Sequence, residues 1–312
     1  MELSYVAFDS FGVKSSCIKI KTPDVTITID PGIAIETDSF PLPFYKRAAL
    51  VAYYKRKILE ACKSSDVIAI THYHYDHHIP EKPFYKDKLL LIKHPTSFIN
   101  KSQRDRAAYF LDVVKDHAKE IKIADSKLFT FGNTEVKFSK PLWHGPKGTK
   151  LGYVLMVSVS HKKEKILFTS DLNGIYIAEY VDLIASEKPS IVIADGFPSY
   201  LLGYLASYEN LKKSISNNIR LLEKTNAKLY IIDHHLLRDY RYREIYYEVY
   251  KAAKEMKKNV LTAAEVLKKT PAVIEAYKKY GPTRWEHWQE FTFSYLNKII
   301  KKAKAKVRKT RT

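Results

Sequence analysis

The stretch Asp66-Val67-Ile68-Ala69-Ile70-Thr71-His72-Tyr73-His74-Tyr75-Asp76-His77-His78 decides how this chain is interpreted. Its first half is a short apolar run rich in β-branched residues, which predicts a buried strand. The second half carries closely spaced groups that can bind a metal ion: His72, His74, Asp76, His77 and His78. Zinc, iron and manganese accept imidazole and carboxylate, so one loop at the end of this strand could serve two neighbouring ions. The alternative is a solvated turn rich in histidine, but such close spacing favours a metal centre.

Three later segments repeat this arrangement, in which an apolar run ends at a potential ligand. The ligands are His144, then Asp171, then the pair His234 and His235. The runs before them cover residues 136–138, 165–169 and 228–232. A polar residue at the end of one strand is common, so a single case would mean little. Together with His72 there are several, and we expect these side chains to meet at one site.

The ligands and their order resemble those of the metallo-β-lactamase-fold hydrolase superfamily. The pattern is His72-x-His74-x-Asp76-His77, followed by His144, Asp171 and His234. Asp30, in Ile29-Asp30-Pro31-Gly32, is similar to the superfamily's first motif, an aspartate that ends an early strand. The resemblance covers residues 4 to 236 and is strongest to an uncharacterised archaeal branch of predicted metal-dependent hydrolases. The stretch from Asp171 to His234 is too short for the β-CASP insertion of nuclease members, and no Gly-Pro-rich arm like that of ribonuclease Z is evident.

The resemblance implies a centre with two divalent metal ions. It assigns the first ion to His72, His74 and His144, and the second ion to Asp76, His77 and His234. Asp171 would bridge the two, and Asp76 and Asp171 are therefore the expected catalytic residues. Two adjacent cations bring the pKa of a water between them toward neutrality, so that hydroxide is available for hydrolysis. Zinc is the expected metal, with iron and manganese as alternatives.

Several neighbours of these ligands are expected to support them. Asp30 and Asp233 are candidates for orienting a ligand imidazole or the loop backbone. His78 and His235 each lie beside an assigned ligand, and one of them would be the ligand if the register were shifted by one. We favour His234 over His235 because, like His72, it follows an apolar strand by one polar residue.

Two further residues are candidates for lining a substrate pocket. Asp195 lies in the run Asp195-Gly196-Phe197-Pro198, and Arg238 follows His234 closely. Each is explained equally well by a structural turn or by a surface ion pair.

The order of apolar patterns predicts an α/β fold, an αββα sandwich of two sheets with helices on their outer faces. Strands are expected at 4–8, 15–21, 24–30, 66–71, 89–92, 136–139, 151–160, 165–169, 190–194 and 228–232. Helices are expected at 46–64, 96–118, 175–186 and 207–225, with Thr96 and Ser207 as helix caps.

After residue 238 the pattern becomes almost purely helical. Helices are expected at 240–257, 262–269, 271–279 and 284–304, with no strand among them. We therefore predict a catalytic domain over residues 1–238 and a helical extension over 239–312 that packs on it. Trp285 and Trp288 are expected to anchor the last helix rather than to stack on bases.

The charge of the chain favours anionic partners. The formal net charge is +19, and residues 298–312 form a basic tail without an acidic residue. Eight cations lie in that tail, so most of the excess lies elsewhere in the chain. Such a charge attracts polyanions at moderate salt and favours phosphorylated or nucleic-acid substrates. The alternative is a lysine-rich solvated surface with no partner, and no base-reading motif is present.

Composition predicts a cytoplasmic protein without a membrane span. No apolar run reaches the length of a membrane helix, and the first residues do not resemble a signal peptide. The two cysteines, Cys17 and Cys62, are expected to be buried free thiols, which suits a reducing compartment. Few Cys and Met residues with abundant Lys, Glu and Tyr resemble the composition of proteins from hot environments.

Three functions follow from these observations. The first is a phosphodiesterase or nuclease, which the charge favours. The second is a lactonase or thioesterase acting on a small molecule. The third is a non-catalytic metal-binding or nucleic-acid-binding protein, against which the intact ligand pattern argues. The ligands alone do not choose between the first two, because hydroxide attacks phosphorus and carbonyl carbon alike.

Overall fold

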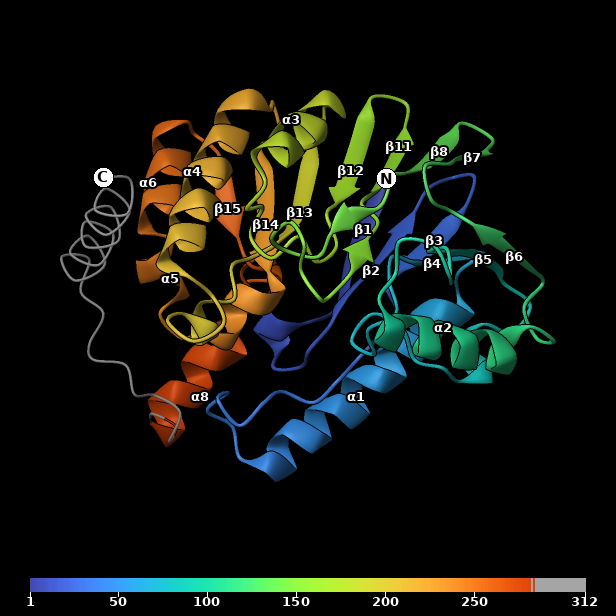
Figure 1. The fold of residues 1–312 in the computed structure, drawn as a ribbon, viewed down its shortest axis with the longest axis horizontal. Helices are drawn as coiled ribbons and strands as arrows, with labels where there is room; N and C mark the ends of the chain where they lie inside the picture. The colour runs from blue at the N-terminus through green and yellow to red at the C-terminus, as the bar shows by residue number, and fades with distance from the viewer. Residues whose placement is uncertain (282, 284–312) are drawn as a thin grey trace.

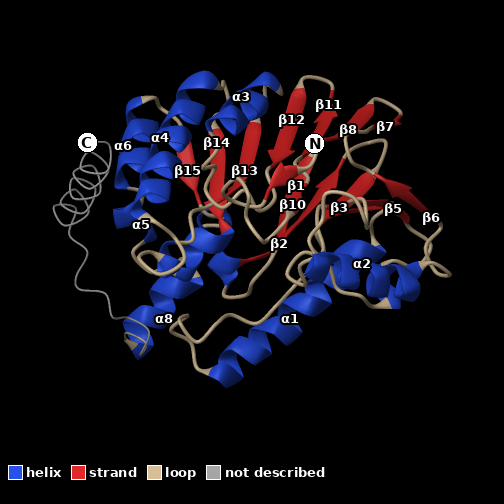
Figure 2. Ribbon diagram, viewed as in Figure 1, coloured by secondary structure: helices blue, strands red, loops and turns tan. Residues whose placement is uncertain are grey.

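The computed structural model describes residues 1–281 and residue 283 of the chain (Figure 1). Two β-sheets lie face to face, and helices cover the outer face of each (Figure 2). Strands and helices form at the apolar runs of the sequence. An apolar sheet face must be buried against another element, so each sheet packs against the other sheet on one face and against helices on the opposite face. The αββα prediction is confirmed.

The first sheet contains six strands in the order β1-β2-β3-β4-β5-β6. Strands β1 to β3 are antiparallel, and β3 to β6 are parallel. Helices α1 and α2 pack against the outer face of this sheet (Figure 1). The bounds are β1 Glu2–Phe8, β2 Ser16–Lys21, β3 Thr26–Ile29, β4 Val67–Ile70, β5 Leu89–Ile92, β6 Glu120–Ile123, α1 Phe44–Lys63 and α2 Lys101–Val114.

The second sheet has the order β15-β14-β13-β12-β11-β8-β7, with β12 to β15 parallel. Helices α3, α4 and α6 cover its outer face (Figure 1). The strands are β7 Leu128–Phe131, β8 Thr134–Phe138, β11 Val157–His161, β12 Glu164–Phe168, β13 Ile191–Asp195, β14 Leu229–Asp233 and β15 Asn259–Leu261, with a separate pair β9 Leu142–Trp143 and β10 Tyr153–Val154. The helices are α3 Ala178–Ser186, α4 Tyr208–Lys224, α5 Tyr242–Ile245, α6 Tyr247–Glu255, α7 Ala263–Val266 and α8 Ala272–Tyr280. Short 3-10 helices are η1 Asp9–Phe11, η2 Lys82–Phe84, η3 Ser199–Leu201 and η4 His234–Arg238.

Three apolar clusters hold these layers together. The central cluster joins the inner faces of the two sheets, through residues such as Ile27 of β3 and Ile166 of β12. A second cluster lies between the first sheet and α1 and α2, and a third lies between the second sheet and its helices. Removal of this apolar surface from water is the main stabilising contribution to such a sandwich.

Some predicted elements differ from the structure. The expectation that the segment after residue 238 adds no strand is wrong, because β15 pairs in parallel with β14. Strands β6 and β7 were not expected, since each has only alternating half-buried residues and lacks a continuous apolar run. Helix α2 begins at Lys101 rather than at 96, because the side chain of Asn100 accepts the first-turn N–H of Gln103 and caps the helix there. Ser207 caps α4 as predicted.

Other expectations fall partly outside the described residues. The helix at 284–304, the tail 298–312, Trp285 and Trp288 all lie there. Among the residues that the structure describes, no helix combines the length and apolar character needed to cross a membrane. Cys17 and Cys62 are buried free thiols, as expected. The division into domains at residue 238 stays a prediction.

Candidate metal centre

The predicted ligands gather where parallel strands of both sheets end. The histidine-rich loop follows β4, Asp171 follows β12 and His234 follows β14. Parallel strands in one sheet place their carboxyl ends at one edge, where loops form a crevice. Here the edges of the two sheets meet, so ligands far apart in the sequence become neighbours.

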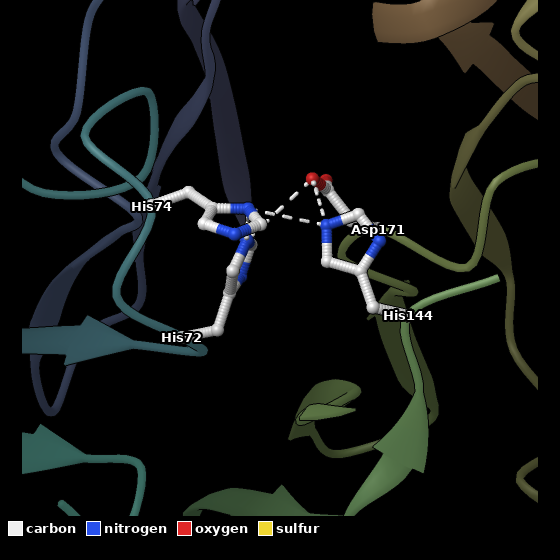
Figure 3. Close-up of side chains that lie close together, drawn as sticks. All are labelled: His72, His74, His144 and Asp171. Atoms are coloured by element: carbon white, nitrogen blue, oxygen red, sulfur yellow. Dashed lines mark hydrogen bonds and ion pairs between the residues drawn. The ribbon is translucent and has the colours of Figure 1, made fainter. Parts of the chain in front are cut away.

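The first ligand set contains His72, His74, His144 and Asp171 (Figure 3). His74 Nδ1 lies 3.2 Å from both His72 Nε2 and His144 Nε2. Asp171 Oδ2 lies 3.2 Å from His144 Nε2 and 3.5 Å from His72 Nε2. His72 and His74 belong to one loop, Asp171 follows β12 of the second sheet, and His144 follows β9 of the separate two-stranded pair (Figure 3).

The second ligand set contains Asp76, His77 and His234, with the other oxygen of Asp171. His77 Nε2 lies 3.0 Å from Asp171 Oδ1, and His234 Nε2 lies 3.5 Å from the same oxygen. His234 Nε2 is also 3.9 Å from Asp76 Oδ2. Asp171 therefore directs Oδ2 toward the first set and Oδ1 toward the second.

The residues of both sets fit metal ions. Ligand atoms about 2.1 Å from a tetrahedral ion are separated by roughly 3.4 Å, close to the distances found in both sets. The buried atoms His77 Nε2, His234 Nε2 and Asp171 Oδ1 have no hydrogen-bond partner among the described residues. Burying unpaired polar atoms is costly, and ions between them would remove that cost.

The two sets differ in protonation. Burial lowers the pKa of His74 to about 3, with His144 adding to the effect, and burial also lowers the pKa of His72. In the second set, burial opposes protonation of His77, but Asp171 and Asp30 outweigh it and raise its pKa to about 10.

His234 behaves in the same way as His77. Burial opposes its protonation, but Asp9 and Asp171 hold its pKa well above the usual value. The carboxylates around His77 and His234 therefore favour positive charge at the second set, which a bound cation would also supply.

Asp30 supports the second set from β3. Its Oδ2 lies 2.7 Å from His77 Nδ1, and the same carboxylate accepts the backbone N–H and the hydroxyl of Thr71. A carboxylate behind a ligand imidazole fixes its tautomer and orientation. Asp30 contacts His77 and the strand-end backbone at Thr71, and its role in orienting a ligand imidazole stays a prediction.

Asp9 supports His234 in the same way and was missed in the sequence. It is fully buried directly after β1, and its Oδ2 lies 2.6 Å from His234 Nδ1. Its Oδ1 accepts from Arg238 Nε at 2.5 Å. A sequence signal for this role was present. Asp9 directly follows the predicted strand 4–8, just as Asp30 is the last residue of the predicted strand 24–30.

His235 and Asp195 form a pair beside the two sets. His235 Nδ1 lies 3.0 Å from Asp195, while Asp195 also accepts the backbone N–H of Asn173. His235 lies within reach of Asp171 and His234, but His234 is the one placed between Asp171 and Asp76. The assignment of His234 rather than His235 as the ligand stays a prediction.

His78 and Asp233 lie outside both ligand sets. His78 Nδ1 donates to the backbone carbonyl of His74, and its ring packs against Tyr73 and Phe110. Asp233 accepts backbone N–H groups of Ser10, His234 and Ala263, so it anchors the loops around the site. Neither residue belongs to a ligand set, and His78 Nε2 has no hydrogen-bond partner among the described residues.

The backbone around the ligands is unusually constrained. A Cβ on Gly32 would lie 2.1 Å from the backbone nitrogen of His77, so only glycine lets the first motif approach the histidine loop. Asp30, Ser170 and His234 all have positive φ angles where their strands end. Left-handed non-glycine residues concentrate at functional sites, where the surrounding structure holds them in place.

Comparison with known proteins identifies close relatives in archaea. The chain is 43% identical over 292 residues to a UPF0282 protein of Methanocaldococcus jannaschii, covering 89% of this chain and 96% of the relative. It is 39% identical over 292 residues to a UPF0282 protein of Methanopyrus kandleri, covering 89% and 98%. No family model matches the chain.

Solved structures share the fold at low sequence identity. Unliganded yeast PDE1 aligns with a TM-score of 0.51 at 14% identity, covering 83% of this chain and 96% of that chain. The metallo-beta-lactamase fold protein YhfI of Bacillus subtilis aligns with a TM-score of 0.47 at 16% identity, covering 80% and 87%. The chain has the metallo-β-lactamase fold.

Proposed function

The chain belongs to the UPF0282 family, and we propose that it is a metal-dependent hydrolase that cleaves a phosphodiester at a centre of two ions. The observation that carries the proposal is the position of Asp171. One of its oxygens faces three histidines of the first set, and the other faces His77 and His234. A carboxylate so placed can hold two cations close together, as two-metal hydrolysis requires.

The residues of the chain supply the geometry of the reaction. Bound divalent ions would activate a water between them and polarise the bond under attack. Asp30 and Asp9 hold the imidazoles of His77 and His234 in the tautomer that leaves Nε2 free for a ligand bond. Asp76, with its side chain 18% exposed, is the ligand of the second set that solvent reaches.

The charge of the chain supports an anionic substrate. A net charge of +19 raises the local concentration of anions at moderate salt, and a phosphodiester is an anion that also suits a dicationic site. A lactone or thioester would gain nothing from that charge.

A substrate panel on the metal-loaded protein tests the proposal. We expect hydrolysis of bis-p-nitrophenyl phosphate that a chelator abolishes, and loss of at least about a thousandfold in His74→Ala, because a ligand of the first ion is removed. His117→Ala is the matched control, since His117 is a histidine outside both ligand sets. Its activity should equal that of the unchanged protein.

Two other outcomes would replace the proposal. Turnover of lactones or thioesters with inert phosphodiesters would identify a carbonyl-centre hydrolase. Absence of turnover on every substrate class, with metal bound, would favour a non-catalytic metal-binding or nucleic-acid-binding protein. Binding of single-stranded DNA that weakens steeply with salt would by itself show only that the positive surface charge attracts polyanions, and it would not support hydrolysis.

A further inference from the structure

Two cations lie near Asp76, a ligand of the second set that is only partly buried. Arg238 Nη2 lies 3.8 Å from Asp76 Oδ2. Lys14 interacts electrostatically with both Arg238 and Asp76. Neither cation belongs to the ligand sets.

Arg238 has one donor that no described residue uses. Its Nε donates to Asp9, and its Nη1 donates to the hydroxyl of Tyr200 at 2.9 Å. Its Nη2 lies 3.8 Å from Asp76 Oδ2 and has no hydrogen-bond partner among the described residues, although Arg238 is only 6% exposed. A buried guanidinium donor without an acceptor is costly, and an oxyanion beside Asp76 would satisfy it.

Lys14 is the second of these cations. Its half-buried ammonium interacts with Arg238, Glu36, Asp76 and Asp9, and burial together with Arg238 lowers its pKa. Within residues 1–281 and 283, it forms no ion pair within 4.0 Å. The carboxylates around Lys14 also interact with Arg238, so the two cations share the same negative charges.

The nearby carboxylates do not balance both cations. Asp9 is shared between Arg238 and His234, and Asp76 faces the second ligand set. Glu36 lies 3.8 Å from Arg238 Nε, too far for a hydrogen bond, and neither of its oxygens has a partner among the described residues. Burial, with Asp9 adding to it, raises the pKa of Glu36 to about 8.

We propose that Lys14, Arg238 Nη2 and the Tyr200 hydroxyl form a subsite for a second oxyanion of the substrate, next to the second ligand set. This inference rests on the proposed function and narrows it to substrates with an anionic group beside the bond that is cleaved. Two cations and a phenol hydroxyl suit a phosphate dianion, and a carboxylate is the other source of the same chemistry.

The test is titration calorimetry of inorganic phosphate and of acetate into the metal-loaded full chain at low salt. Lys14→Met is the central variant, because Lys14 belongs to neither ligand set and forms no ion pair among the described residues, so the metal content should stay unchanged. We expect the dissociation constant for phosphate to rise about tenfold or more. Lys115→Met is the control, because it removes the same charge from an exposed ion pair outside the site. It should change the dissociation constant for phosphate less than about twofold.

Arg238→Lys is the second variant, since lysine keeps the charge but loses the forked donors. Metal content is measured in parallel, because Arg238 also holds Asp9. Phosphate binding weakened in Lys14→Met and Arg238→Lys, with metal retained, supports the subsite. If acetate binds more tightly than phosphate and is equally sensitive to Lys14→Met, the subsite is supported, and the anionic group of the substrate is then a carboxylate.

Equal phosphate affinity in Lys14→Met and the unchanged protein would overturn the subsite, as would absence of phosphate binding. Because this readout needs no turnover, it is independent of the substrate panel. Inert phosphodiesters with Lys14-dependent phosphate binding would reject the proposed reaction alone, and active phosphodiesters with Lys14-independent binding would reject the subsite alone.

Discussion

The two ligand sets are alike in residue types but differ in what stands behind them. In the second set, His77 is backed by Asp30 and His234 by Asp9. In the first set, His72 Nδ1 faces only the hydroxyls of Thr71 and Ser170, at 3.1 and 3.4 Å. His144 Nδ1 has no hydrogen-bond partner among the described residues.

This difference gives the two sets different electrostatic characters. A carboxylate behind an imidazole makes it more basic and fixes its orientation, so the second set is a prearranged but protonated pocket. In the first set, Asp171 is the carboxylate beside the histidines and supplies the negative charge. We therefore expect the second set to lose more affinity when its support is removed and to respond more strongly to pH.

The largest effect is expected from the residue that the two sets share. Asp171→Ala removes an oxygen from each set and should abolish binding of both ions, with affinity falling at least about a thousandfold. Elemental analysis after dialysis measures it, with His78→Ala as the control that keeps both ions. Retention of one ion in Asp171→Ala would show that the sets are independent, contrary to the bridging position.

The next effect separates the two sets by their supports. Asp9→Asn keeps the size of the side chain but removes the charge behind His234, and should weaken the second ion about 10–100-fold. Ser170→Ala removes a hydroxyl behind His72 and should weaken the first ion less than about tenfold.

Competition with a chelating dye measures both affinities in each variant. Since Asp9 also binds Arg238, thermal unfolding of the metal-free Asp9→Asn variant checks that the fold is kept. Equal losses in Asp9→Asn and Ser170→Ala would remove the contrast between the sets.

The smallest effect is the change in metal affinity over one pH unit. The pKa of His77 is raised to about 10, so its proton is bound at neutral pH and must leave when an ion binds. Loss of this proton should make the affinity of the second set rise about tenfold per pH unit, up to about pH 10. The pKa values of His72 and His74 are lowered, that of His74 to about 3, so these two histidines have no such proton to release and the first set should respond less.

Variants that keep a single set measure this response. His144→Ala retains the second set and His234→Ala retains the first, and each is titrated with zinc at several pH values. Parallel pH profiles for the two variants would contradict the assigned protonation.

The sequence revealed those parts of the site that are local. The loop 72–78 carries four of the ligands in one run, so its role could be predicted without knowledge of the fold. Asp171 and His234 were expected because each follows an apolar strand, whereas His144 lies beyond the run 136–138 and follows the two-residue strand β9. The αββα architecture followed from the same strands.

The parts that could not be predicted depend on contacts between distant segments. Asp9 acquires its role only because η1 packs against η4, where His234 and Arg238 lie. Its sequence signal was a single aspartate after a strand, which is common in proteins. Strand β15 is three residues long, and its pairing with β14 decides its conformation more than its own composition does.

The central claim is that two ions lie on opposite sides of the Asp171 carboxylate. A crystal structure of the metal-loaded protein, with anomalous diffraction recorded at the metal edge, tests it most directly. We predict two peaks roughly 3.5–4 Å apart, one beside His72, His74 and His144 and the other beside Asp76, His77 and His234, each within bonding distance of one Asp171 oxygen. A single peak under metal-replete conditions, or two peaks of which either lies away from Asp171, would contradict the account.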